Sequence, residues 1–200
     1  MSKIVFVCTK NQFRSPLAAA IFRNELLVQK FPPLWQVDSA GSWVSQIAPA
    51  TPEALIEAQK RGLDLKDHLS KGIEEIPRSS IDVMFVMETG QKESILLDYP
   101  RLKKRVFLLS ELIGLEFSIP DPYQTSEPYS TIASEIESLI IPNFEQILTW
   151  QNTLNSADFF TWLPSPFSLK LTKKGGTTAS DFCCSFELLN FIDSSSRLFS

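Results

Sequence analysis

A short segment near the N-terminus constrains the fold of this chain more than any other feature. Residues 3–7 form an apolar, β-branched run typical of a buried parallel strand. Residues 15–30 have a helical pattern with Pro16 in the first turn, where proline loses no hydrogen bond. Between them, Cys8 and Arg14 bracket five residues. Such a strand, loop and helix turn backbone N–H groups and the positive end of the helix dipole toward one point, so the segment predicts a site for a phosphate-sized anion.

Cys8 lies where this loop would activate a nucleophile. The N–H groups, the helix dipole and Arg14 all favour negative charge, so we expect the thiolate to be stabilised. Arg14 offers a planar fork of donors for two oxygens of a phosphoryl group. Ser15 can donate a hydrogen bond to the thiolate, which would help it to leave a phosphocysteine intermediate. The alternative is that Cys8 is only a small, buried apolar residue at a strand end.

The rest of the chain alternates strands and helices. Predicted strands cover residues 3–7, 35–39, 82–87 and 106–109. Predicted helices cover residues 15–30, 52–61, 90–98 and 131–150. Thr51 is expected to cap the second helix, Gly62 to end it, and Pro142 to kink the last one. The order predicts an α/β fold, a doubly wound four-stranded parallel sheet with helices on both faces and a phosphate-binding loop after its first strand.

At these residues the chain resembles the low-molecular-weight protein-tyrosine phosphatases, whose loop reads Cys-x-Gly-Asn-x-x-Arg-Ser-Pro. Residues 37–41 resemble the end of that family's second strand, residues 62–68 its glycine and histidine stretch, and residues 119–123 its Asp-Pro-Tyr acid loop. The likeness covers residues 1–150 in the same order. It implies hydrolysis of phosphotyrosine in proteins, and of small aryl phosphates, through a phosphocysteine intermediate and without a cofactor.

The resemblance also assigns roles. Asp121 becomes the general acid for the leaving group and then the base for the attacking water; taken alone, Asp-Pro-Tyr could be an ordinary turn. Tyr123 and Trp43 become aromatic walls for the phosphotyrosine ring, although Trp43 could equally be a core residue. His68 is the only histidine, and it joins a hydrogen-bond network with Asn11, Ser15 and Ser39 that holds the loop. The remaining substrate-binding positions lie in the loop and at the start of the helix that follows it: Thr9, Lys10, Asn11, Gln12, Phe13 and Ser15.

Two loop residues depart from the family pattern. Lys10 stands where the family has glycine, so a position that could require a permissive backbone carries a side chain and a charge. Lys10 could strengthen the attraction for anions or distort the loop. Phe13 stands where many members have a second cysteine.

Composition sets limits on other functions. The net charge of −4 argues against a general nucleic-acid binder, and the basic run at residues 101–105 is interpreted as the solvated end of a helix before a strand. With one histidine and no zinc-ligand spacing, no metal site is expected. The chain has neither a signal-peptide pattern nor an apolar span of about 18 residues. We therefore expect no membrane partner and a reducing, cytoplasmic location, where a catalytic thiolate survives. The resemblance implies a tyrosine-phosphorylated protein as the partner, and the sequence indicates no oligomeric state.

Residues 151–200 form a tail of unknown role beside the predicted catalytic domain of residues 1–150. The tail contains Cys183 and Cys184 and aromatic and proline-rich pieces without a clear period. It is interpreted as a partner-binding tail, a disordered extension, or sequence outside the natural functional unit, such as a misread frame.

Two further functions remain open. Arsenate resembles phosphate, so an arsenate reductase could use the same scaffold, but coupling to thioredoxin needs two more cysteines near residues 82–95, and none is there. The other is a phosphate or phosphoprotein binder in which Lys10 prevents turnover.

Overall fold

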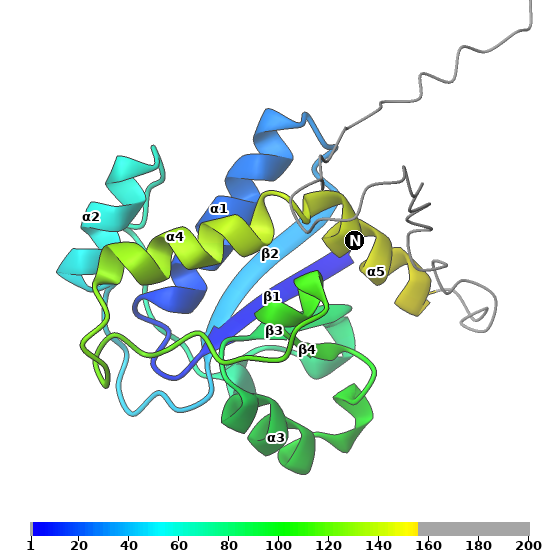
Figure 1. Ribbon diagram of the computed structural model, residues 1–200. Helices are drawn as coiled ribbons and strands as arrows, with labels where there is room; N and C mark the ends of the chain where they lie inside the picture. Colours follow the sequence, from blue (N-terminus) through cyan, green and yellow to red (C-terminus); the bar gives the residue numbers. More distant parts are fainter. Residues whose placement is uncertain (1, 156–200) are drawn as a thin grey trace, which may run out of the picture. The chain divides into compact units, whose positions relative to one another are not determined.

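A four-stranded parallel sheet forms the centre of the computed structural model, which describes residues 2–155 (Figure 1). Its strands are β1 (Ser2–Cys8), β2 (Trp35–Gly41), β3 (Val83–Val86) and β4 (Val106–Leu108). Their spatial order is β2-β1-β3-β4, and all pairs are parallel. The predicted four-stranded, doubly wound sheet is confirmed.

Helices cover both faces of the sheet. They are α1 (Arg14–Val28), α2 (Pro52–Lys60), α3 (Thr89–Asp98), α4 (Tyr129–Ile140) and α5 (Phe144–Asn155). Four short 3-10 turns complete the fold: η1 (Ile73–Glu75), η2 (Arg78–Ser80), η3 (Pro100–Leu102) and η4 (Leu109–Ile113). The buried apolar residues of α1, α2, α4 and α5 belong to one core, and those of α3, η1 and η3 belong to the other. Figure 1 shows these helices around the sheet.

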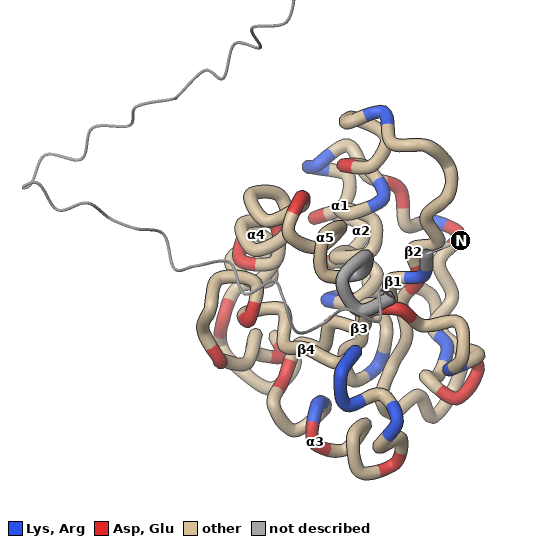
Figure 2. Tube along the Cα trace, turned by 90° about the vertical axis from the view of Figure 1, so that its right-hand side faces the viewer, with Lys and Arg blue, Asp and Glu red and all other residues tan. Residues whose placement is uncertain are grey.

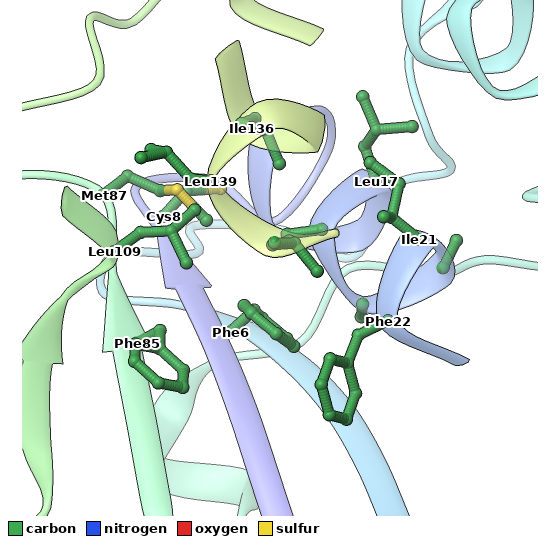
Figure 3. Close-up of a cluster of buried hydrophobic side chains, with 14 of the residues drawn as sticks. Phe6, Cys8, Leu17, Ile21, Phe22, Phe85, Met87, Leu109, Ile136 and Leu139 are labelled. Carbon is green, nitrogen blue, oxygen red and sulfur yellow. The ribbon is translucent and has the colours of Figure 1, made fainter. Parts of the chain in front are cut away.

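The alternation of side chains along β1 explains why the sheet has one hydrophobic core on each face. Successive side chains of a strand point to opposite faces, so Ile4, Phe6 and Cys8 join one core while Val5 and Val7 join the other. Figure 3 shows Phe6 between Phe22 of α1 and Phe85 of β3, and it shows Cys8 at the tip of β1. The ring centroids of Phe6 and Phe85 lie 5.8 Å apart. The reactive end of β1 is thus anchored in a rigid core.

Helix boundaries largely follow the predicted signals. Thr51 caps α2 by accepting a hydrogen bond from the Ala54 N–H at 3.2 Å, and Gly62 follows the helix with a left-handed φ of +69°. Both predictions are confirmed. The expected single helix over residues 131–150 is wrong: Pro142 separates α4 from α5, because proline lacks the N–H that would continue the α4 hydrogen bonds.

Basic and acidic residues are scattered along the chain, and Figure 2 shows blue and red segments intermixed over its surface. Within the basic run at residues 101–105, Arg101, Lys103 and Lys104 are exposed and Arg105 donates a hydrogen bond to the Ile81 carbonyl at 2.6 Å. In residues 2–155, no helix has the length and apolarity needed to cross a bilayer. The predicted domain boundary at residue 150 falls inside α5, and most of the predicted tail lies outside the described residues.

Candidate active site

The loop between β1 and α1 places Cys8 at the carboxyl edge of the sheet. Cys8 is the last residue of β1, and α1 begins at Arg14. The strand order reverses at β1, which lies between β2 and β3, and this is where doubly wound sheets bind ligands. Cys8 Sγ is buried and lies 3.1 Å from Ser15 Oγ. The thiol therefore faces the N-terminal end of a 15-residue helix, whose dipole favours an anion there.

Asn11 holds the loop in shape. Its φ of +55° is left-handed, a conformation that asparagine tolerates better than most residues. Its side-chain N–H groups donate to Ser15 Oγ and Ser39 Oγ, both at 2.9 Å, and its Oδ1 accepts from the Lys71 N–H at 3.1 Å. Asn11 is fully buried. All of its side-chain contacts are thus used to fix the loop against the end of β2.

His68 supports Asn11 from outside the loop. His68 Nε2 lies 2.7 Å from the Asn11 carbonyl oxygen. Burial lowers the pKa of His68, the nearby Arg23 and Lys71 lower it further, and the Asn11 hydrogen bond and Asp38 partly offset this. The ring is therefore neutral at pH 7, and the tautomer that fits carries its proton on Nε2 and donates it to Asn11. The structure brings together the four residues of the expected network.

Lys10 does not occupy the strained position of the loop. Among the described residues, only Asn11 and Lys30 combine a side chain with a left-handed φ. The close approach falls instead on Gly41, where a Cβ would lie 2.7 Å from the Thr9 carbonyl oxygen. The Lys10 side chain extends outward, with Nζ 5.1 Å from the centroid of the Tyr123 ring. A lysine therefore fits this loop position without a left-handed backbone.

Arg14 is the most constrained side chain of the site. Its guanidinium is only 2% exposed. Nη1 donates to the Ile119 carbonyl at 2.8 Å and to Glu88 Oε1 at 2.6 Å. Nη2 lies 2.9 Å from Asp121 Oδ2. One buried cation thus connects the loop after β1 with residues that follow β3 and β4.

Asp121 is placed by its own loop. The preceding Ile119 N–H donates to the Met87 carbonyl at 2.7 Å, which fastens the segment to the end of β3. Asp121 Oδ1 accepts from the Tyr123 N–H at 3.1 Å, an interaction that turns the following residues. The side chain is 9% exposed. The carboxyl group therefore lies beside Arg14 at the Cys8 pocket.

Glu88 and Gln91 belong to the site but were not predicted. Glu88 caps α3 directly after β3, and Gln91 Nε2 donates to Glu88 Oε1 at 2.8 Å and to Thr9 Oγ1 at 3.1 Å. Thr9 Oγ1 also lies 3.4 Å from Arg14 Nη2. The sequence offered one clue to Glu88, which is its position. In a parallel sheet, a residue that follows β3 lies at the same edge as the loop that follows β1.

Two adjacent hollows open beside the loop. The first is small and is lined by Cys8, Lys10, Gln12, Phe13, Arg14, Asp121 and Tyr123. The second has a volume of about 140 Å³ and is lined by Lys10, Gln12, Trp43, Val44, Ser45 and Gln46.

The two expected aromatic wall residues lie at different hollows. Phe13 is buried and its ring meets Tyr129 edge-on, with centroids 4.9 Å apart. Tyr123 borders the Cys8 pocket, whereas Trp43 is 75% exposed and borders only the second hollow. The expected pair of aromatic walls around one pocket is therefore not formed here, and Trp43 is not a core residue.

The chemistry available is that of a thiol, a guanidinium and a carboxyl group. Within residues 2–155, no group of three histidine, cysteine or acidic residues could hold a metal ion. Nothing in the donor set indicates an organic cofactor. The N-terminus of α1, the loop N–H groups and Arg14 favour an anionic ligand next to Cys8 Sγ.

The chain is similar to known phosphatases in sequence. The family model for low molecular weight phosphotyrosine protein phosphatase matches residues 3–151. The chain is 30% identical over 154 residues to a protein-arginine-phosphatase of Geobacillus stearothermophilus, an alignment that covers 74% of this chain and 98% of that relative. It is 33% identical over 121 residues to the probable low molecular weight protein-tyrosine-phosphatase EpsP of Ralstonia nicotianae, covering 60% of this chain and 78% of that relative.

The same similarity holds for the fold. The tyrosine phosphatase Wzb of Escherichia coli K30, solved in complex with sulphate, superposes with a TM-score of 0.64 at 26% identity. The superposition covers 73% of this chain and 98% of Wzb. The likeness therefore includes the sheet, its helices and the loop that carries Cys8.

Proposed function

The chain belongs to the low molecular weight phosphotyrosine protein phosphatase family, and from this premise we propose that it hydrolyses phosphotyrosine in proteins and small aryl phosphates. The observation that carries the proposal is the convergence of Cys8, Arg14 and Asp121 on one pocket at the N-terminus of α1. The bound sulphate of Wzb, a tetrahedral anion, supports the view that this fold binds phosphate.

The first step transfers the phosphoryl group to sulfur. The Cys8 thiolate attacks phosphorus, the S–P bond forms, and the bond from phosphorus to the phenolic oxygen breaks. Arg14 and the loop N–H groups stabilise the equatorial oxygens as the phosphoryl group passes between the two. Asp121 donates its proton to the departing oxygen, so the product is a neutral phenol. Asp121 Oδ2 lies 2.9 Å from Arg14 Nη2, so the carboxyl group is held beside the guanidinium that would bind the phosphoryl group.

The second step releases phosphate. Asp121, now ionised, takes a proton from water while the water oxygen attacks phosphorus and the S–P bond breaks. Ser15 Oγ lies 3.1 Å from Cys8 Sγ and 3.2 Å from the Ala40 carbonyl oxygen, and its single hydroxyl proton can turn to either. A thiolate leaving group accepts that proton in a hydrogen bond. Ser15 is therefore placed to stabilise the departing thiolate.

Phosphoarginine is the second candidate substrate, because relatives that match this chain include protein-arginine-phosphatases. The charge of Lys10 argues against it. Lys10 Nζ lies over the Tyr123 ring at the mouth of the pocket, where a phosphoarginine would bring its cationic guanidinium. Two like charges there are unfavourable, whereas the neutral ring of phosphotyrosine is not repelled. Lys10 thus favours a phenolic leaving group.

The site also bears on arsenate reduction and on binding without turnover. Cys8 is the only cysteine in the described part of the chain, so a thiol relay for arsenate reduction has no partner there. Lys10 has no left-handed φ and its Nζ lies over the Tyr123 ring, which argues against a loop that Lys10 distorts into a non-catalytic binder. A catalytic thiolate requires a reducing compartment, and we therefore infer that the enzyme acts on phosphoproteins in the cytoplasm.

The test is hydrolysis by wild type and Cys8→Ser of three substrates: 4-nitrophenyl phosphate, a phosphotyrosine peptide and the matched phosphoarginine peptide. Wild type should hydrolyse the first two and prefer phosphotyrosine to phosphoarginine. Cys8→Ser should lose at least about 10³-fold in rate, because serine stays protonated where cysteine ionises. Binding of inorganic phosphate by the variant serves as the control for folding. Turnover by Cys8→Ser, or no aryl phosphatase activity in wild type, would overturn the proposal.

A further inference from the structure

The second hollow shares one wall with the Cys8 pocket. Lys10 and Gln12 line both cavities, while Trp43 and Gln46 line only the second. A phosphorylated side chain that enters the Cys8 pocket therefore brings the neighbouring part of its peptide over the second hollow. At about 140 Å³, this hollow can receive one side chain.

Lys10 is the charged residue of this wall. The other residues that line the second hollow are neutral. Arg14, the other cation beside the Cys8 pocket, is already paired with Glu88 and Asp121. By contrast, no carboxylate among residues 2–155 lies within ion-pair distance of Lys10, whose recorded contact is the Tyr123 ring. Within this part of the chain, the mouth of the site thus presents a cation without an anionic partner.

The contact of Lys10 with Tyr123 leaves this charge available. Nζ lies 5.1 Å from the ring centroid, within the range of a cation–π contact, but such contacts are weak at exposed sites. The lysine side chain is long and flexible, so it can turn from Tyr123 toward the second hollow. Trp43 also lines the second hollow and is three-quarters exposed, so it offers apolar surface to the stem of an entering side chain.

We propose that the hollow between Lys10 and Trp43 is a substrate subsite for an anionic side chain next to the phosphorylated residue. The anion is a carboxylate or a second phosphate, since both would pair with the Lys10 ammonium. This inference rests on the proposed phosphatase function and adds to it a selection of sequence context. Lys10 is then a specificity-determining residue.

The test compares phosphotyrosine peptides that differ at one neighbouring position. The peptides carry Glu, phosphoserine or Gln on the N-terminal side of the phosphotyrosine in one series and on the C-terminal side in another. In 20 mM salt, where screening is weak, wild type should prefer the anionic peptides over Gln by at least about fivefold in kcat/KM in one of the two series. Raising the ionic strength should reduce that preference. A preference for both Glu and phosphoserine over Gln, at least as large for the more highly charged phosphoserine, identifies charge as the recognised feature.

Lys10→Gln should remove the preference, because glutamine keeps much of the side chain and loses the charge. The ratio of anionic to neutral peptide is the readout, so a general change in rate cancels. Lys103→Gln is the matched control: Lys103 is exposed and precedes β4, at the opposite edge of the sheet. Trp43→Ala should raise KM for all peptides alike.

Two results would overturn the subsite. One is equal kcat/KM for anionic and neutral peptides in wild type, and the other is an unchanged preference in Lys10→Gln. Hydrolysis of 4-nitrophenyl phosphate separates this failure from that of the proposed function. If wild type hydrolyses this small substrate but shows equal kcat/KM for anionic and neutral peptides, the proposed phosphatase function is supported and the proposed subsite is wrong.

Discussion

Arg14 Nη2 and Asp121 Oδ2 lie 2.9 Å apart, so the proposed phosphate clamp and the proposed general acid are ion-paired with each other. A phosphate dianion that enters the pocket competes with Asp121 for Arg14. Once the dianion takes the contact with Arg14, the Asp121 carboxyl group is free to turn toward the leaving group, where the proposed acid must act. Substrate binding and placement of the proposed acid are thereby linked through Arg14.

The first prediction concerns leaving groups. Asp121→Asn keeps the shape of the side chain but supplies no proton to the departing oxygen. We expect kcat for a phosphotyrosine peptide to fall by about 10²- to 10⁴-fold. The loss for 4-nitrophenyl phosphate should be smaller, because nitrophenolate leaves without protonation. Equal losses for both substrates in steady-state assays would show that Asp121 has only a structural role.

The second prediction concerns Glu88, which holds Arg14 through a 2.6 Å ion pair. Glu88→Gln keeps an acceptor but removes the charge that orients Arg14. We expect kcat to fall by about tenfold, because a misplaced donor stabilises the transition state less well. Inhibition by inorganic phosphate should not weaken, since the variant removes negative charge from the site.

Glu93→Gln is the control for Glu88→Gln. Glu93 lies exposed on the same helix, α3, so its replacement should leave both quantities unchanged. If Glu88→Gln weakens phosphate inhibition and kcat together, Glu88 supports the pocket as a whole rather than the direction of Arg14.

The loop of this site could be predicted because its parts are neighbours in sequence. Cys8, Arg14 and Pro16 mark the end of a strand, the loop and the start of a helix. Each of these can be predicted from residues that are neighbours in the sequence. Glu88 could not be predicted in the same way, because an acid after a strand has no local signature. Its contact with Arg14 depends on β3 pairing directly with β1, a property of the whole sheet.

Three other features show the same limit. The close backbone approach to the loop falls on Gly41, which the loop pattern cannot reveal because Gly41 comes from β2. Trp43 could not be assigned, since no local pattern fixes which way the chain leaves β2. The helical period before and after Pro142 was visible, but the choice between a kink and a break depends on packing. There, Phe144 packs on Phe22 with ring centroids 5.2 Å apart.

The third prediction concerns acid stability. The pKa of His68 is lowered mainly by burial, so below about 6.5 the unfolded chain takes up a proton that the folded chain resists. The free energy of unfolding should therefore fall as the pH drops from 7 to 5. His68→Gln has no such titration, and its stability should fall less over this range in urea unfolding experiments.

The pKa values of Asp38 and Glu57 are also lowered, so these groups change the free energy of unfolding at lower pH. They do so in wild type and in His68→Gln alike, so their contributions largely cancel in this comparison. Parallel losses of stability in wild type and His68→Gln would show that His68 does not contribute to the acid sensitivity.

The fourth prediction defines the folded unit. A chain ending at Asn155 keeps all of α5 and every proposed site residue, so it should retain the melting temperature and the rate of the full chain. A chain ending at Pro142 loses Phe144, Ile147 and Leu148, which are buried, at about 1.5–3 kcal/mol each. It also loses Trp150, whose ring centroid lies 4.8 Å from that of Phe107. Thermal unfolding of the two chains provides the measurement, and inactivity of the longer one would place residues 156–200 in the functional unit.

The last prediction concerns oxidation. A thiolate poised to attack phosphorus is also the form that peroxide oxidises to a sulfenic acid. The sulfur escapes further oxidation if a second thiol condenses with the sulfenic acid, which forms a reducible disulfide and releases water. Phe13, buried against Tyr129, occupies the loop position at which many relatives could supply that thiol, and Cys8 is the only cysteine of residues 2–155. We therefore expect peroxide to carry Cys8 on to the sulfinic acid, with poor recovery of activity in dithiothreitol.

The chain ending at Asn155 is the decisive comparison for oxidation, because it lacks Cys183 and Cys184. In this chain the Cys8 peptide should gain two oxygen atoms by mass spectrometry, and activity should stay lost after reduction. Inorganic phosphate should protect both chains, since it occupies the anion site in front of Cys8 Sγ. If only the full chain recovers, one of the two distal cysteines reaches Cys8. Full recovery of the shorter chain, with no mass change on the Cys8 peptide, would contradict the prediction.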